Sequence, residues 1–202
     1  MPGAEEISNA LVGAWRLTLR EASARDCFRI DGYGVVNSFF AMILAIPVYF
    51  LTATALWRMA TEFGVETNAD LGTFTGAYII GALLHWVLYL FAMIPASQRL
   101  GLVNSFGAYI VTYNWGTLFT ALAMAIPFAL FSLGAISAAV ATMLTMPGWT
   151  LLGWYRWQIA RTVFGAEQPI ALALVLFDFV LSITVSQVVG WLLMPGVTTG
   201  AM

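Results

Sequence analysis

Residues 101–157 read GLVNSFGAYIVTYNWGTLFTALAMAIPFALFSLGAISAAVATMLTMPGWTLLGWYRW. This stretch is 57 residues long, and its one charged residue, Arg156, stands next to its end. A membrane helix needs about 20 apolar residues to cross the roughly 30 Å hydrocarbon layer, so the stretch is too long for a single crossing. It must turn back, and we expect the turn around residues 132–134. The sequence therefore predicts two membrane helices here, at 113–131 and 135–157.

Three further apolar runs are long enough to cross a bilayer. They cover residues 35–57, 73–94 and 169–194. Residues 102–112 are interpreted as an interfacial or half-inserted lead-in to the third span. The predicted fold is therefore all-α, a polytopic membrane protein with five transmembrane helices.

The composition agrees with a location in lipid. Of the 202 residues, 61% are hydrophobic and 9% are charged, whereas a water-soluble domain has about 25% charged residues. The net charge of −2 argues against a nucleic-acid partner, which needs a basic face. The single Cys27 excludes an internal disulfide and a cysteine metal cage. All eight basic residues are arginine, which fits a GC-rich bacterial genome and hence a bacterial inner membrane.

The arginines predict the orientation, because basic residues stay at the cytoplasmic ends of membrane helices. With the N-terminus in the cytoplasm, only Arg58 faces the periplasm. Seven arginines are expected to face the cytoplasm: Arg16, Arg20, Arg25, Arg29, Arg99, Arg156 and Arg161. Residues 1–34 then form a cytoplasmic segment, 35–194 the five-span bundle and 195–202 a short periplasmic tail.

The N-terminal segment contains an amphipathic pattern between Glu5 and Ala24. Apolar or small side chains recur at helical spacing on one face, at Ile7, Leu11, Ala14 and Thr18. This pattern favours an interfacial helix on the inner leaflet. A solvated helix docked on the protein's own loops is the alternative interpretation.

Two ionisable side chains are expected deep inside predicted spans, His85 and Asp178. An aspartate at the bilayer centre costs about 2.5–3.5 kcal/mol, so it normally faces the bundle interior and has a partner. At a rise of 1.5 Å per residue, His85 lies about 2 Å and Asp178 about 5 Å from the centre of its span, both on the cytoplasmic side. We expect the two side chains to meet between the second and fifth spans.

Small and hydroxyl residues repeat every four positions along the same two spans. They are Ala77 and Gly81 before His85, and Ser182, Ser186 and Gly190 after Asp178. Such stripes let helix backbones approach closely. Three roles for the pair remain open: polar contacts that fix the helix register, proton or ion handling, and ligand binding.

One ligand follows from a resemblance. Gly81 and His85 form a G-x-x-x-H pattern that resembles the element with which antenna polypeptides of purple bacteria ligate bacteriochlorophyll. The resemblance implies a pigment held by His85 alone. A haem with two histidine ligands is excluded within one chain, which has a single histidine. No cofactor and no metal are otherwise expected.

Glu62, Glu66 and Asp70 are spaced four residues apart on the periplasmic side. On a continuous helix these carboxylates would repel one another, so we expect a hydrated loop in which Asp70 or Thr73 caps the next span. Calcium binding is the alternative. The sequence contains no nucleophile with a base, no phosphate-binding glycine loop and no metal-ligand spacing, so enzymatic activity is not expected.

Two resemblances to known proteins bear on the expected function. The run Gly13, Ala14, Trp15, Arg16, Leu17, the stretch 28–32 and residues 37–39 resemble small alphaproteobacterial inner-membrane proteins without an assigned activity. The five-span layout is similar to that of the Yip1-like group, which implies a trafficking or scaffold role.

From these observations we expect an accessory or scaffold membrane protein. Its partners would be membrane lipids and other integral membrane subunits, or further copies of the chain. The alternative is a small ion- or proton-coupled transporter or channel component that uses His85 and Asp178.

Overall fold

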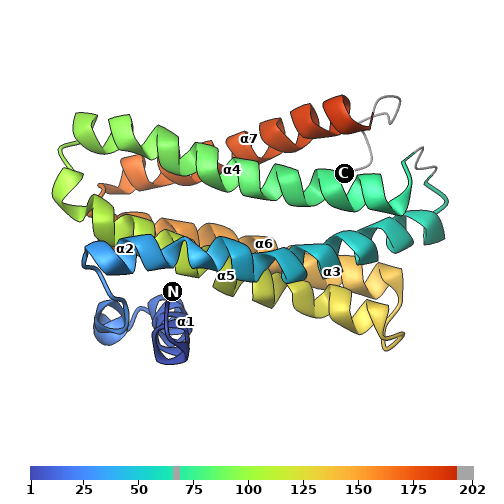
Figure 1. Cartoon of the computed structure of the whole chain (residues 1–202), viewed down its shortest axis with the longest axis horizontal. Helices are drawn as coiled ribbons and strands as arrows, with labels where there is room; N and C mark the ends of the chain where they lie inside the picture. Colours follow the sequence, from blue (N-terminus) through green and yellow to red (C-terminus); the bar gives the residue numbers. More distant parts are fainter. Residues whose placement is uncertain (66–68, 195–202) are drawn as a thin grey trace.

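The computed structural model describes residues 1–65 and 69–194, and within these ranges the chain is helical without β-strands. Five long helices lie side by side along the molecule (Figure 1). They are α3 (Phe40–Glu62), α4 (Leu71–Arg99), α5 (Val103–Ser132), α6 (Ala138–Gln158) and α7 (Gln168–Leu193). Four shorter segments complete the fold: α1 (Ala4–Thr18), the 3₁₀ segment η1 (Ala22–Cys27), α2 (Gly32–Ser38) and the π-helical segment η2 (Ile159–Phe164). The predicted tail at 195–202 lies outside the described residues.

Four helical stretches are long and apolar enough, by length and composition, to cross a membrane. They are α2 continued by α3, then α4, α5 and α7. The first begins at Gly32, three residues before the predicted start of the span, and Asp31 caps it by accepting a bond from Gly34 N at 2.7 Å. The predicted span at 135–157 corresponds to α6, which is not among the four. Threonine, glycine and proline residues interrupt its apolar sequence.

Two sequence-based boundaries are wrong. The second span is predicted to end at Ile94, whereas α4 continues through Pro95 to Arg99. A proline removes one backbone donor and bends a helix without having to end it, because in membrane helices neighbouring groups can satisfy the freed carbonyl. Residues 103–112 are not a separate lead-in, because they form the first turns of α5. A continuous helix satisfies its own backbone groups, which a half-inserted segment cannot do in lipid.

The turn between α5 and α6 lies where the sequence predicts it. Gly134 has φ +74°, a left-handed conformation that glycine adopts without a Cβ penalty. Its backbone N–H donates to Phe131 O at 2.9 Å, which closes the end of α5. Ser137 then caps α6, with its hydroxyl accepting from Val140 N at 3.4 Å.

Helix α1 ends at Thr18, so the helix expected to continue to Ala24 is shorter than predicted. Arg20 follows with φ +61°, and this left-handed residue reverses the chain into η1. Figure 1 shows α1 nearly end-on, so it crosses the direction of the long helices. It packs against α5 and α6 through its buried face. That face consists of Ala10, Gly13, Ala14 and Leu17.

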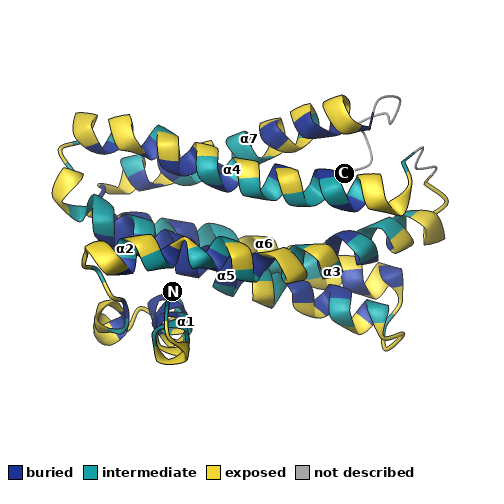
Figure 2. Ribbon diagram, in the orientation of Figure 1, coloured by how far each residue is buried: buried dark blue, intermediate teal, exposed yellow. Residues whose placement is uncertain are grey.

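The core is rich in aromatic residues, and α5 contributes most to it (Figure 2). The largest fully buried side chains of the core come from α4, α5 and α6, and they are Trp86, Tyr89, Tyr109, Tyr113, Trp115 and Tyr155. Gly116 permits the close approach of α5 and α6, because a Cβ at this position would overlap the ring of Tyr155 on α6. The five long helices thus leave many apolar side chains, some of them aromatic, on their outer faces and bury these six large aromatic side chains inside.

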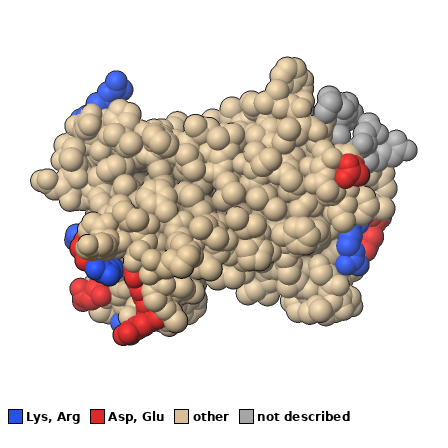
Figure 3. Space-filling model, viewed as in Figure 1, with Lys and Arg blue, Asp and Glu red and all other residues tan. Residues whose placement is uncertain are grey.

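Charged side chains gather toward the two ends of the long helices. On the face shown in Figure 3, a wide belt without acidic or basic side chains separates the two groups. A belt of this kind is the surface expected of a bundle surrounded by hydrocarbon.

Candidate functional site: a buried ion-pair network

The structure brings His85 and Asp178 together. His85 lies on α4 and Asp178 on α7, two helices that pack side by side. His85 Nε2 lies 3.1 Å from Asp178 Oδ1, so a proton on Nε2 is donated to the carboxylate. The Asp178 side chain is 6% exposed and that of His85 is 16% exposed.

A second cationic partner of Asp178 comes from α6. Arg156 Nε lies 3.2 Å from Asp178 Oδ2, and the Arg156 side chain is 6% exposed. The prediction that Arg156 faces the cytoplasm is therefore wrong. Residue 156 lies in the last turn of α6, where the helix still packs against α5 and α7, and its long side chain points back among them. A buried carboxylate needs a cationic partner. The sequence offered one indication of it, because Arg156 lies inside the predicted span 135–157.

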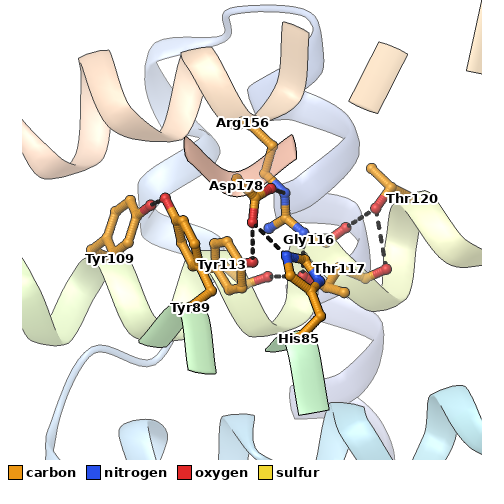
Figure 4. A network of polar contacts seen from close by, with 9 residues as sticks. All are labelled: His85, Tyr89, Tyr109, Tyr113, Gly116, Thr117, Thr120, Arg156 and Asp178. Atoms are coloured by element: carbon orange, nitrogen blue, oxygen red, sulfur yellow. Dashed lines mark hydrogen bonds and ion pairs between the residues drawn. The ribbon is translucent and has the colours of Figure 1, made fainter. Parts of the chain in front are cut away.

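Helix α5 completes the arrangement with Tyr113 and Thr117. The Tyr113 hydroxyl donates to Asp178 Oδ1 at 2.9 Å, and the Arg156 guanidinium lies 3.8 Å from the centre of the Tyr113 ring. Arg156 Nη2 donates to Thr117 Oγ1 at 2.9 Å. These five residues, His85, Tyr113, Thr117, Arg156 and Asp178, are called the Asp178 network below, and Figure 4 shows that they come from four helices.

The network balances its own charge. One arginine faces one aspartate, and both oxygens of the carboxylate have partners. Taking two charges out of water is costly, and their mutual attraction offsets this only when further hydrogen bonds satisfy the groups. Arg156 Nη1 has no hydrogen-bond partner within the described ranges, and Nε contacts the carboxylate as an ion pair without hydrogen-bonding geometry. With His85, Tyr113 and Thr117, the pair joins α4, α5, α6 and α7 at one point.

Two further polar contacts extend the buried region. Tyr89 stacks on Tyr113 at 4.7 Å between ring centres, and its hydroxyl lies 2.7 Å from that of Tyr109. Separately, Trp86 Nε1 donates to Asn114 Oδ1 at 2.8 Å, and Asn114 Nδ2 donates to Ser38 Oγ at 2.8 Å. The second chain connects α4, α5 and α2.

The predicted small-residue stripes are only partly at the helix contact. Ala77 and Gly81 are buried, and Gly81 faces Val189 of α7. On α7, Gly190 is buried, Ser182 is half-buried and Ser186 is exposed. A spacing of four residues turns by about 40° per step against the helical period of 3.6, so such a stripe leaves the interface. Val185 and Val189 occupy the contact instead.

The geometry also bears on the pigment hypothesis. His85 Nε2 is directed at Asp178, and Gly81 packs toward Val189, where a macrocycle would have to lie. His85 would have to leave Asp178 in order to ligate a pigment through Nε2. These residues as arranged do not fit a macrocycle beside Gly81.

The three carboxylates Glu62, Glu66 and Asp70 are described only in part, because Glu66 lies outside the described residues. Asp70 caps α4 as predicted, and its carboxylate accepts from Gly72 N at 2.8 Å and Thr73 N at 3.1 Å. The Thr73 hydroxyl donates to it at 2.7 Å, and these bonds lower the pKa of Asp70 below its usual value. Across residues 1–65 and 69–194, no group of three or more His, Cys, Asp or Glu side chains could hold a metal ion.

Comparisons with protein-family models, with curated proteins and with solved structures found no match for this chain. The likeness to alphaproteobacterial inner-membrane proteins and to the Yip1-like group therefore stays a prediction. Any functional conclusion depends on the geometry of the site.

Proposed function

We propose that the chain is an accessory or scaffold protein of a bacterial inner membrane, which crosses the bilayer five times and packs against other membrane components. Four of the crossings correspond to the four apolar stretches. The fifth is α6, whose 21 residues span about 31 Å at the helical rise. Support for this crossing comes from its position beside α5, along which it packs.

The distribution of arginines supports a cytoplasmic N-terminus. With Arg156 assigned to the interior, only Arg58, near the end of α3, remains on the periplasmic side in this topology. Six arginines lie on the opposite side of the bundle in this topology, namely Arg16, Arg20, Arg25, Arg29, Arg99 and Arg161. This six-to-one bias is what the positive-inside rule predicts for an odd number of crossings with the N-terminus inside.

Helix α1 would then lie in the cytoplasmic interface. Its buried face packs on the bundle, while Val12, Trp15 and Leu19 are exposed on another side. Exposed tryptophan and leucine on a helix that crosses the bundle direction favour contact with the headgroup region.

The full partnering of Asp178 is the observation that carries the scaffold proposal. Its two oxygens face Arg156, His85 and Tyr113, and its charge is balanced inside the protein. A transport site must exchange its partners for an ion or a proton, whereas a structural site keeps them. The contacts therefore favour a network that holds four helices in one register.

Two measurements test the proposal. Purification in a mild detergent should recover the chain with a second membrane protein or with further copies of itself. Wild-type protein in liposomes loaded with a pH-sensitive dye should show no proton flux above that of empty liposomes under an imposed gradient. A wild-type flux that Asp178→Asn abolishes, with unchanged circular dichroism, would overturn the scaffold role.

Ion or proton coupling is the second candidate. One observation favours it: His85 is the more exposed member of the pair and contacts the carboxylate directly. An ion or proton that reaches Asp178 from the α4 side would pass this ring. The liposome experiment decides between the two candidates, and the absorption spectrum of the purified protein tests the pigment alternative.

A further inference from the structure

A cavity of about 420 Å³ lies between the N-terminal segment and the end of α6. Its wall combines the residues that follow α1, the segment η1 and the segment η2. None of these residues belongs to the Asp178 network. The lining residues include three arginines, Arg20, Arg25 and Arg161.

The charge of the wall is positive. Three arginines stand against one acid, Glu21, which leaves a formal charge of +2. Glu21 also forms an ion pair with Arg16, outside the lining, at 3.5 Å. The negative charge of Glu21 is thus shared with Arg16, which does not line the cavity. The three lining arginines are therefore not neutralised by the acidic residue of the lining.

The arginines have little else to bind. Arg25 makes no ion pair and no side-chain hydrogen bond within the part of the chain that the structure describes, and it is exposed. Arg161 donates one bond, from Nη1 to Ala166 O at 2.9 Å. Arg20 lies over the ring of Trp154 at 4.3 Å, a contact that positions the guanidinium without neutralising it.

Gln158 supplies a second, independent indication. This residue lines the cavity and is 3% exposed, and its Nε2 has no hydrogen-bond partner within residues 1–65 and 69–194. A buried amide donor without an acceptor is costly, and because Nε2 itself is closed to solvent, an oxygen of a bound anion would satisfy it once the amide turns toward the cavity. Leu17, Trp157 and Val163 contribute apolar surface to the same cavity.

We propose that this cavity binds a phosphate ester, held by Arg20, Arg25, Arg161 and the Gln158 amide. Arginine is the side chain suited to phosphate, because its guanidinium offers paired donors in a plane. The group would come from an anionic phospholipid headgroup or from a soluble phosphate compound. The lipid source depends on the proposed membrane topology, in which the cavity lies at the cytoplasmic headgroup level, where basic pockets bind anionic headgroups.

The test measures thermal unfolding of the full chain in detergent micelles doped with phosphatidylglycerol, with phosphatidylcholine, or with inorganic phosphate added instead. Phosphatidylglycerol should raise the unfolding midpoint, and phosphatidylcholine should not. An equal rise with inorganic phosphate alone would identify a soluble ligand as the source. No rise with either phosphate source would overturn the proposal.

Variants separate the cavity from general surface charge. Arg25→Gln should weaken phosphatidylglycerol binding about tenfold, as expected for one lost charge-assisted bond. The matched control is Arg99→Gln, which removes an exposed arginine of the same side outside the cavity and should bind as wild type does. Equal binding by Arg25→Gln and wild type, or equal losses in both variants, would contradict the proposal.

Gln158→Met distinguishes ligand binding from a structural role. It removes an unpartnered buried donor at similar volume, so the lipid-free protein should be at least as stable as wild type while its response to phosphatidylglycerol falls. A variant that keeps the full response would contradict the role of the amide.

Carbonate extraction of cell membranes separates the cavity proposal from the membrane proposal. Release of the chain by carbonate would contradict the membrane proposal. Retention of the chain without a stability response to phosphatidylglycerol or inorganic phosphate would contradict only the cavity proposal.

Discussion

Arg156 Nε lies 3.2 Å from Asp178 Oδ2, and each of the two side chains is 6% exposed. The two residues belong to α6 and α7 and are 22 positions apart in the sequence. Their contact joins α6, the least apolar of the five long helices, to α7, which carries the buried carboxylate. The stability of the bundle should therefore depend on both charges being present.

Removing one charge of this pair should be strongly destabilising. Asp178→Asn leaves the buried Arg156 without a counter-charge, and a loss of about 3–5 kcal/mol in the free energy of unfolding is expected. Denaturation in mixed micelles, followed by circular dichroism, measures the change. The double variant Arg156→Met with Asp178→Leu should recover a large part of the loss. A single variant as stable as wild type would show that the charges are not coupled.

The hydroxyl of Tyr113 should matter more than that of Tyr89. Tyr113→Phe removes a bond to a charged carboxylate, worth about 1.5–3 kcal/mol, and retains the ring beside Arg156. Tyr89→Phe removes a bond between two neutral hydroxyls, worth about 0.5–1.5 kcal/mol, and serves as the matched control. The same denaturation assay ranks the two variants, and the reverse order would contradict the assigned partners.

Gly116 should not tolerate a methyl group. In Gly116→Ala the new Cβ would overlap the Tyr155 ring, and overpacking of this kind costs about 1–3 kcal/mol. Gly76 on α4 has no atom within 4 Å of the same position. Gly76→Ala should therefore be neutral or stabilising, because alanine is the better helix former. Equal stability of the two variants would show that α5 and α6 are not in close contact.

Asp70 should make stability depend on pH. Its folded pKa is below the ordinary value of 3.8, mainly because the Thr73 hydroxyl and backbone N–H donate to the carboxylate. The contribution is complete above the ordinary pKa and is lost as the pH falls through the lower, folded pKa. Asp70→Asn keeps a capping side chain that does not titrate, so its unfolding midpoint should fall less than that of wild type in this acid range. Parallel pH profiles for the two proteins would contradict the assignment.

Cysteine labelling tests the fifth crossing. In a Cys27→Ser background, Leu133→Cys marks the turn between α5 and α6, and Glu167→Cys marks the start of α7. An impermeant maleimide added to intact cells should label position 133 and not position 167, and both should react after lysis. Labelling of both positions from outside, or of neither, would show that α6 does not cross. In the wild-type protein, which keeps Cys27, this cysteine should stay unlabelled in intact cells.

Several features of this protein could be predicted from the sequence because they depend on local chain properties. Apolar runs predicted the all-α fold, and Gly134 predicted the turn after α5. The common depth of His85 and Asp178 followed from counting residues along two helices, because the rise per residue is constant. The contact between these side chains also requires that α4 and α7 be neighbours, as they are in the structure.

Only the tertiary structure decided what surrounds that pair. The sequence does not specify the rotation of a helix about its axis, which depends on the packing of all its neighbours. For this reason Ser186 lies outside the predicted interface, and the Arg156 side chain lies among the helices rather than facing the cytoplasm at the end of its predicted span. Tyr113 joined the network for the same reason, since nothing in its local sequence distinguishes it from other buried tyrosines. The position of a residue along a helix follows from the constant rise per residue, whereas the direction in which its side chain points depends on how all the helices pack together.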